Sequence, residues 1–169
     1  MQASCSLRSL DDANAAPLLW ALGVQINIIE RFESFAADFE AAVGDDDWSR
    51  LGHYLADDAT YMNVGGPDPK CEGREAILAF FQKDVAVSDR RFDKRSLIAL
   101  TPPVTRGDHL SRRWRCTYKL FGAPDLVIEG EARYAFCDGL IKEIEEEPTP
   151  DSVQRLSKWM QKNEAKLHT

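Results

Sequence analysis

Residues 54–63 read Tyr-Leu-Ala-Asp-Asp-Ala-Thr-Tyr-Met-Asn, and residues 73–77 and 80–81, after a loop rich in glycine and proline, read Gly-Arg-Glu-Ala-Ile and Phe-Phe. The first part of this stretch predicts the end of a short helix followed by a strand over Thr60–Val64. Gly65–Pro69 then predicts a turn-rich loop, and a further helix is expected from Gly73 to about Lys83. The order helix, strand, loop and helix within one short segment decides the fold.

An amphipathic helix is predicted before this stretch. Asn27 and Glu30 form a start similar to a capping box, and Gly44 provides a stop. Between them, apolar side chains recur at steps of three and four residues: Ile28, Phe32, Phe35, Phe39 and Ala42. A shorter helix carrying Trp48 and Leu51 follows, because the acidic residues 45–47 are suited to its N-terminal end.

Beyond residue 92 the pattern changes to long strands separated by turn residues. The expected strands cover residues 92–100, 109–120, 126–136 and 140–147. Such strands joined by short turns predict an antiparallel meander. Apolar and charged side chains alternate along the second and third of these strands, so one face of the sheet should be apolar. Thr149-Pro150 predicts the start of a C-terminal helix, whose expected apolar stripe is Val153, Leu156 and Met160.

Helices, a curved antiparallel sheet and a final helix together predict an α+β fold with helices on one face of the sheet. The order of Ala-Asp-Asp-Ala-Thr, Gly-Arg-Glu-Ala and Asp-Gly-Leu-Ile resembles the SnoaL-like, ketosteroid-isomerase-like and nuclear-transport-factor-2-like superfamily over about residues 28–147. The resemblance implies a cone-shaped sheet that encloses a pocket with the N-terminal helices. We therefore expect an N-terminal extension (1–26), a SnoaL-like cone-fold domain (27–147) and a C-terminal helix (148–169).

Composition restricts the class of partners. The 169 residues suit one domain, and the net charge of −7 disfavours nucleic acid and anionic membranes. Four scattered cysteines and three separated histidines lack metal-ligand spacing, which predicts reduced thiols and no metal or organic cofactor. The apolar run 15–24 is too short to span a bilayer and lacks the flanks of a targeting signal. We expect a cytoplasmic protein without a cofactor.

The catalytic pattern of ketosteroid isomerases is not reproduced. The resemblance places Asn63 where those enzymes have a carboxylate base, Phe39 where they have a tyrosine, and Ala132 near their protonated aspartate. None of the three can supply the corresponding group. Phe39 and Ala132 are therefore expected as pocket wall, together with Tyr134.

A nearer resemblance is to enzymes of the limonene-epoxide-hydrolase type. Tyr61 and Asn63 are two residues apart, so both side chains should point to one face of their strand. Glu146, on the last strand, is at the spacing where that family carries its base. The resemblance implies that Tyr61 and Asn63 position a water molecule and that Glu146 takes its proton.

One element of that family's site is missing. Those enzymes have an arginine and an aspartate two residues apart on a middle strand, whereas this chain offers Arg113 and Arg115 or, one residue earlier, Arg112 and Trp114. The ungapped resemblance favours Arg113 as the catalytic arginine. The alternation of the strand favours Arg112 and Trp114 in the pocket, and a shift of one residue exchanges the two faces. The sequence alone does not decide whether Arg112 or Arg113 faces the pocket.

We expect a small-molecule enzyme, a hydrolase, isomerase or cyclase that acts on an apolar substrate with Glu146 as its base. The alternative is a non-catalytic module that binds a ligand or assembles as a dimer. Ordinary structural roles also exist: Glu146 belongs to an acidic run typical of solvated edges, Tyr61 suits a core, and Asn63 suits the turn before Gly65. The resemblance also implies a homodimer.

Overall fold

The computed structural model describes residues 27–66 and 69–168, so the expected extension 1–26 lies outside the described residues. The first helix, α1 (Ile28–Asp45), begins where the sequence predicts. The Asn27 side chain caps it by accepting hydrogen bonds from two backbone N–H groups of the first turn. The helix continues past Gly44, because Asp46 takes the left-handed conformation (φ 66°) that ends it.

The stretch that decides the fold forms the expected elements in the expected order. The second helix is a 3₁₀ helix, η2 (Trp48–Tyr54), and the strand after it begins earlier than predicted. The elements that follow η2 along the chain are β1 (Leu55–Asn63), β2 (Lys70–Glu72), α2 (Arg74–Val87) and η3 (Asp89–Arg91).

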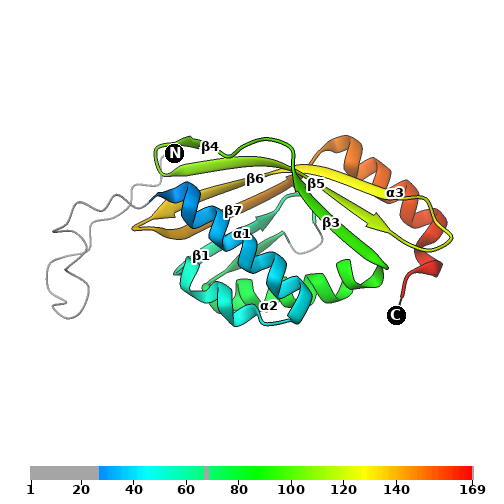
Figure 1. Cartoon of the computed structure of the whole chain (residues 1–169), viewed down its shortest axis with the longest axis horizontal. Coiled ribbons are helices and arrows are strands. Elements are labelled where there is room, and N and C mark those ends of the chain that lie inside the picture. Colours follow the sequence, from blue (N-terminus) through cyan, green and yellow to red (C-terminus); the bar gives the residue numbers. More distant parts are fainter. Residues whose placement is uncertain (1–26, 67–68, 169) are drawn as a thin grey trace, which may run out of the picture.

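The remaining strands form the predicted meander. They are β3 (Lys94–Ala99), β4 (Val104–Arg106), β5 (His109–Lys119), β6 (Leu126–Cys137) and β7 (Leu140–Pro148). The described strands make a seven-stranded sheet of order β2-β1-β7-β6-β5-β3, with β4 paired to β5. The sheet is curved and not closed, and its two edges stay apart (Figure 1).

The sheet departs from the expected antiparallel arrangement at one pair. β1 and β7 run parallel, which sets Asn63 beside Glu146 and Tyr61 beside Ile144. Residues paired in this way project to the same face. The parallel pair therefore brings the stretch that decides the fold next to the last strand.

One face of the sheet is apolar, as the alternation predicts. Every second residue of β6, from Leu126 to Phe136, is buried, and the residues between them are partly exposed. Helices α1 and α2 lie against this face (Figure 1). The outer face carries ion pairs, among them Arg115 with Glu129 at 2.6 Å.

The C-terminal helix α3 (Pro150–Asn163), followed by η4 (Glu164–Lys166), is capped by Thr149 as predicted. Its predicted apolar stripe is wrong for Val153 and Leu156, which are 51% and 40% exposed, whereas Met160 packs against the buried cluster that contains Trp159. Two polar contacts set the helix rotation instead. Ser152 Oγ accepts a hydrogen bond from the Glu129 N–H group at 2.8 Å, and Trp159 Nε1 donates to a backbone carbonyl at 2.7 Å.

Two observations bear on the expected environment. No helix within the described ranges 27–66 and 69–168 is long and apolar enough to cross a membrane. The buried Cys116 is a free thiol.

Candidate functional site

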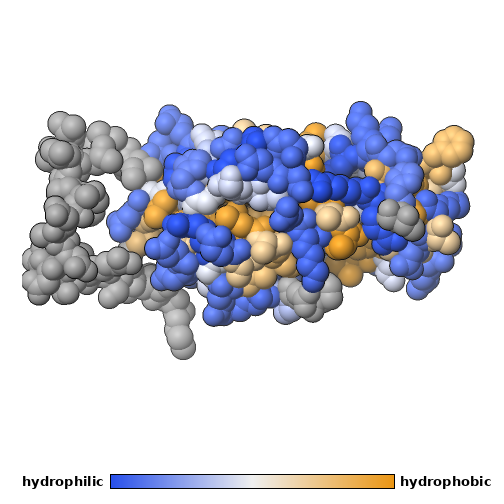
Figure 2. Space-filling view, turned by 90° about the horizontal axis from the view of Figure 1, so that it is seen from below, coloured by the Kyte–Doolittle hydropathy of each residue, from blue (hydrophilic) through white to orange (hydrophobic). Residues whose placement is uncertain are grey.

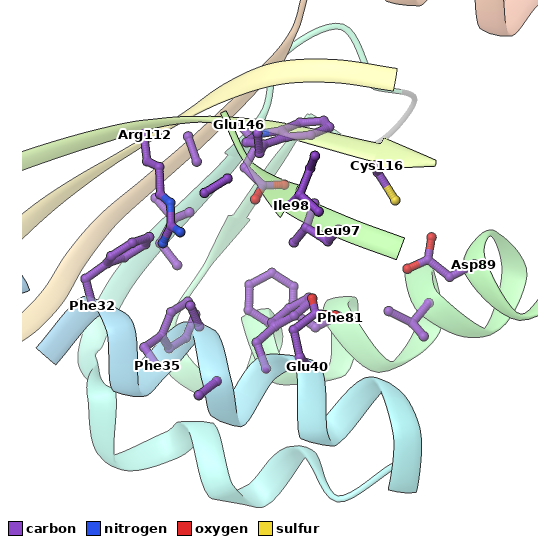
Figure 3. Close-up of a pocket in the computed structure, with 18 of the residues that line it drawn as sticks. Phe32, Phe35, Glu40, Phe81, Asp89, Leu97, Ile98, Arg112, Cys116 and Glu146 are labelled. Atoms are coloured by element: carbon purple, nitrogen blue, oxygen red, sulfur yellow. The ribbon is translucent and has the colours of Figure 1, made fainter. Parts of the chain in front are cut away.

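A cavity of about 410 Å³ lies between the apolar face of the sheet and helices α1 and α2 (Figure 3). Its wall is mostly aromatic and aliphatic. The larger apolar side chains that line it are Phe32, Phe35, Phe39, Phe81, Leu97, Ile98, Trp114, Tyr134 and Ile144. A cavity of this size and character suits a small molecule.

Glu146 extends from the sheet into this cavity (Figure 3). It lies between Asn63 of β1 and Ala132 of β6 in the strand register, so protein surrounds it on both sides. The Tyr61 hydroxyl group donates a hydrogen bond to Glu146 Oε2 at 3.2 Å. Tyr61 is itself buried, and the ring of Phe81 packs edge-on against it with centroids 5.2 Å apart. Tyr61 and Glu146 thus form a fixed pair.

The environment of Glu146 changes its acidity. Burial raises the pKa of the Glu146 carboxyl group above its ordinary value, and the hydrogen bond from Tyr61 opposes that change. The negative charge of Asp84 raises the pKa of Glu146 further. Burial, with the charge of Glu146, also raises the pKa of Tyr61, so the phenol stays a donor. A carboxyl group with a raised pKa in an apolar pocket is suited to proton transfer.

Trp114 occupies the position where the resemblance has a carboxylate. It pairs with Gly130 across β5 and β6, and a Cβ atom at residue 130 would lie 2.5 Å from Cζ2 of the indole. The missing side chain at Gly130 therefore makes room for the ring. The indole Nε1 is buried and has no hydrogen-bond partner in the described part of the chain.

Arg112, and not Arg113, faces the cavity. Arg112 pairs with Glu33 at 3.1 Å, and its guanidinium carbon lies 5.5 Å from the centroid of the Phe32 ring. Arg113 is exposed on the outer face and does not line the cavity. The ungapped resemblance placed Arg113 in the site, and the structure has Arg112 there instead. The alternation of side chains along β5 predicted this register.

Asn63 does not line the cavity either. Its side chain lies against Gly66, where an added Cβ atom would approach Nδ2 to 2.6 Å. Asn63 thus shapes the turn after β1, and Tyr61 and Asn63 do not meet at one point. Phe39, Ala132 and Tyr134 do line the cavity, on α1 and β6.

A second polar group at the other end of the cavity was missed from sequence. Arg95 Nε lies 2.7 Å from Asp89 Oδ2, and Arg95 Nη1 lies 2.7 Å from Glu40 Oε2. The Tyr118 hydroxyl group donates to Asp89 Oδ1 at 2.7 Å. Arg95 and Tyr118 are paired across β3 and β5, so the register of these two strands could have predicted that both lie on the same face. Asp89 lies in a connecting helix, and no pattern marks it.

A metal site is not formed by the residues in the described ranges: no group of three or more His, Cys, Asp or Glu side chains could hold an ion there. The cavity's chemistry is that of carboxyl, phenol and guanidinium groups.

The fold and cavity define the class to which the protein belongs. The model of the SnoaL-like domain matches residues 36–144, and the chain is a member of this SnoaL-like family. No curated protein matches the sequence.

Solved structures share the same fold at low sequence identity. Bal32a, from a soil-derived mobile gene cassette, is 18% identical, with a TM-score of 0.58 over 79% of this chain and 98% of its own. An epoxide hydrolase of the limonene-epoxide-hydrolase type from M. tuberculosis is 15% identical, with a TM-score of 0.57 over 79% and 91%. A ketosteroid-isomerase-like protein from Catenulispora acidiphila, in complex with trimethylamine, is 19% identical, with a TM-score of 0.53 over 70% and 88%. These similarities establish the cone fold, whose members are often small-molecule isomerases or hydrolases.

Proposed function

We propose that this protein is a small-molecule enzyme that transfers a proton within the cavity, with Glu146 as the base and a largely apolar molecule as the substrate. The observation that carries the proposal is the pairing of Glu146 with Tyr61 in an aromatic cavity. Burial raises the pKa of Glu146, so this carboxyl group gains and loses a proton closer to neutral pH than an exposed one.

Tyr61 has two roles in this mechanism. Its hydroxyl group holds one oxygen atom of Glu146, which leaves the other oxygen free to accept a proton from the substrate. The same hydrogen bond stabilises the ionised carboxylate before the reaction. The aromatic wall orients the apolar part of the substrate and excludes water, and both effects favour proton transfer.

Isomerisation or cyclisation fits these residues better than epoxide hydrolysis. Hydrolysis in the manner of the limonene-epoxide-hydrolase type needs a second residue to position water and an acid to protonate the leaving oxygen. Asn63 lies against Gly66 instead, and Trp114 stands where the acid is expected. Proton abstraction and return by Glu146 requires neither group.

The test combines a search for ligands with product analysis. Small apolar compounds that raise the Tm of the protein are incubated with it, and the products are identified by mass spectrometry and NMR. We expect Glu146→Gln to lower turnover by about 10²–10⁴-fold, the usual contribution of general acid–base catalysis. Glu143→Gln, an exposed carboxyl group on the same strand, is the matched control. Equal turnover by Glu146→Gln and wild type would refute the role of Glu146.

Family resemblance also supports a homodimer, which we propose as the solution state. The outer face of the sheet carries ion pairs, for example Arg133 with Glu147 at 2.9 Å, and such a charged face can pair with a copy of itself. Sedimentation equilibrium distinguishes a dimer from a monomer.

A further inference from the structure

The charges along the cavity are unbalanced. Its lining includes two guanidinium groups, and both are already paired: Arg112 with Glu33, and Arg95 with Glu40 and Asp89. The lining also holds five carboxyl groups: Glu33, Glu40, Asp84, Asp89 and Glu146. The excess of negative charge should attract cations and repel anions.

Two of these carboxyl groups lack a cationic partner. Asp84 and Glu146 belong to no ion pair within the described parts of the chain. The Ser88 hydroxyl group donates to Asp84 at 3.4 Å, and Tyr61 donates to Glu146 at 3.2 Å. Each carboxylate therefore has one neutral donor, and a positive charge between the two would offset their repulsion.

The wall near these groups is aromatic. Phe81 lies one helical turn before Asp84 on α2, and its ring is 5.2 Å from the rings of both Phe39 and Tyr61 by centroid distance. The faces of aromatic rings attract ammonium groups, most strongly where water is excluded. Carboxylates and ring faces together are the chemistry that recognises an organic cation.

The surface around the cavity has the same character. Glu33 and Glu40 are exposed residues of α1 that also line the cavity, one near each paired arginine. Leu97 and Ile98 on the edge strand β3 are 40% and 49% exposed. Seen from below, the molecule shows apolar surface between hydrophilic flanks (Figure 2). An approaching ligand thus meets both negative charge and apolar surface.

We propose that the cavity accepts an amphiphilic organic cation, an apolar molecule with a protonated amine, whose ammonium group lies between Asp84 and Glu146. This ligand class rests on the proposed function, since it describes the substrate of the same cavity. A carboxylate ligand would need a free guanidinium group, and both arginines of the lining are committed to acidic residues.

A matched series of probes tests the ligand class without any turnover. Tryptamine, tryptophol and indoleacetate carry the same ring with an ammonium, a hydroxyl or a carboxylate group, and their affinities for the full chain are measured by calorimetry at neutral pH and low salt. We expect tryptamine to bind about tenfold more tightly than tryptophol, with indoleacetate the weakest. Asp84→Asn should reduce this preference several-fold. Asp108→Asn, an exposed carboxylate of the β4–β5 turn, makes the same charge change away from the cavity and should preserve it.

Three results would overturn the ligand class: equal affinities for tryptamine and tryptophol, a preference for indoleacetate, or no measurable binding of any probe. Different results would overturn the proposed function and the proposed ligand class. Cation preference in a protein without catalytic activity would retain the ligand class and remove the proton transfer. Turnover of a neutral compound that depends on Glu146, without cation preference, would retain the proton transfer and remove the ligand class.

Discussion

The Tyr61 hydroxyl group lies 3.2 Å from Glu146 Oε2 and joins the parallel neighbours β1 and β7 through their side chains. Tyr61 is paired in register with Ile144, and Glu146 is two residues further along the same face. This geometry holds a partly buried carboxyl group in the cavity and supplies it with one donor. Acidity, stability and the proposed chemistry all depend on this contact.

Removing the phenol hydroxyl group should make Glu146 a weaker acid. The hydrogen bond from Tyr61 lowers the pKa of Glu146, so Tyr61→Phe is expected to raise it further. Carbon-13 NMR of the glutamate carboxyl groups as a function of pH measures the change. Tyr54→Phe removes a hydroxyl group that donates to Asp38 instead and should leave the titration of Glu146 unchanged. An unaltered titration in Tyr61→Phe would show that the hydrogen bond has no influence.

Neutralising Glu146 should stabilise the fold at neutral pH. The pKa of Glu146 is raised above its ordinary value of 4.5 by folding, so the stability lost to this group grows as the pH rises above 4.5 and is complete once the pH passes the folded pKa. Below about pH 4.5 the carboxyl group is protonated in both states and the cost disappears. Glu146→Gln should therefore raise the Tm at neutral pH, by about 2–4 °C for each kcal/mol removed, and have little effect in acid.

Thermal unfolding across pH measures this difference, with Glu143→Gln as the exposed control. A lower Tm for Glu146→Gln at neutral pH would mean that the ionised carboxylate stabilises the fold.

Gly130 is expected to be intolerant of a side chain. A Cβ atom there would lie 2.5 Å from the Trp114 ring and 2.6 Å from the Glu147 carbonyl oxygen, and the backbone oxygen cannot yield easily. Gly130→Ala should lower the free energy of unfolding by about 1–3 kcal/mol, the usual cost of overpacking. Gly44→Ala meets no atom within 4 Å and lies within α1, so it should be neutral or stabilising. Urea denaturation of both variants checks the contrast, and equal stabilities would contradict it.

The two neighbouring arginines of β5 should differ in their effect on ligands. Arg112→Met removes a positive charge from the cavity and should strengthen the binding of tryptamine about threefold, since partly exposed charges interact weakly. Arg113→Met makes the same change on the outer face and should have no effect. Calorimetric titration of both variants tests the register of the strand in solution. The reverse pattern would place Arg113 in the cavity.

Local patterns in the sequence were sufficient for most of the fold. Asn27 caps α1 as predicted because capping depends on neighbours in the chain. The alternation in β5 placed Arg112 and Trp114 in the cavity, since the strand period is strict. The rotation of α3 was mispredicted because hydrogen bonds of Ser152 and Trp159 to distant backbone groups determine it.

The candidate site was only partly predictable for a similar reason. The family resemblance predicted Glu146 and Tyr61 as site residues, and their side chains are joined by a hydrogen bond. Asn63 is on the same face of the strand, but its side chain lies against Gly66 and shapes the loop. The spacing of residues along a strand does not predict such a contact. Asp84 and Asp89 reach the cavity through the packing of α2 and η3 against the sheet, which depends on the tertiary structure.

The most direct test of proton transfer by Glu146 is solvent deuterium exchange. A compound that raises the Tm of the wild-type protein is incubated with it in deuterium oxide, and NMR follows the entry of deuterium at carbon. We expect exchange by wild type and Glu143→Gln, and exchange at least about 10²-fold slower in Glu146→Gln. Exchange by Glu146→Gln at the wild-type rate would contradict the assignment of Glu146 as the base.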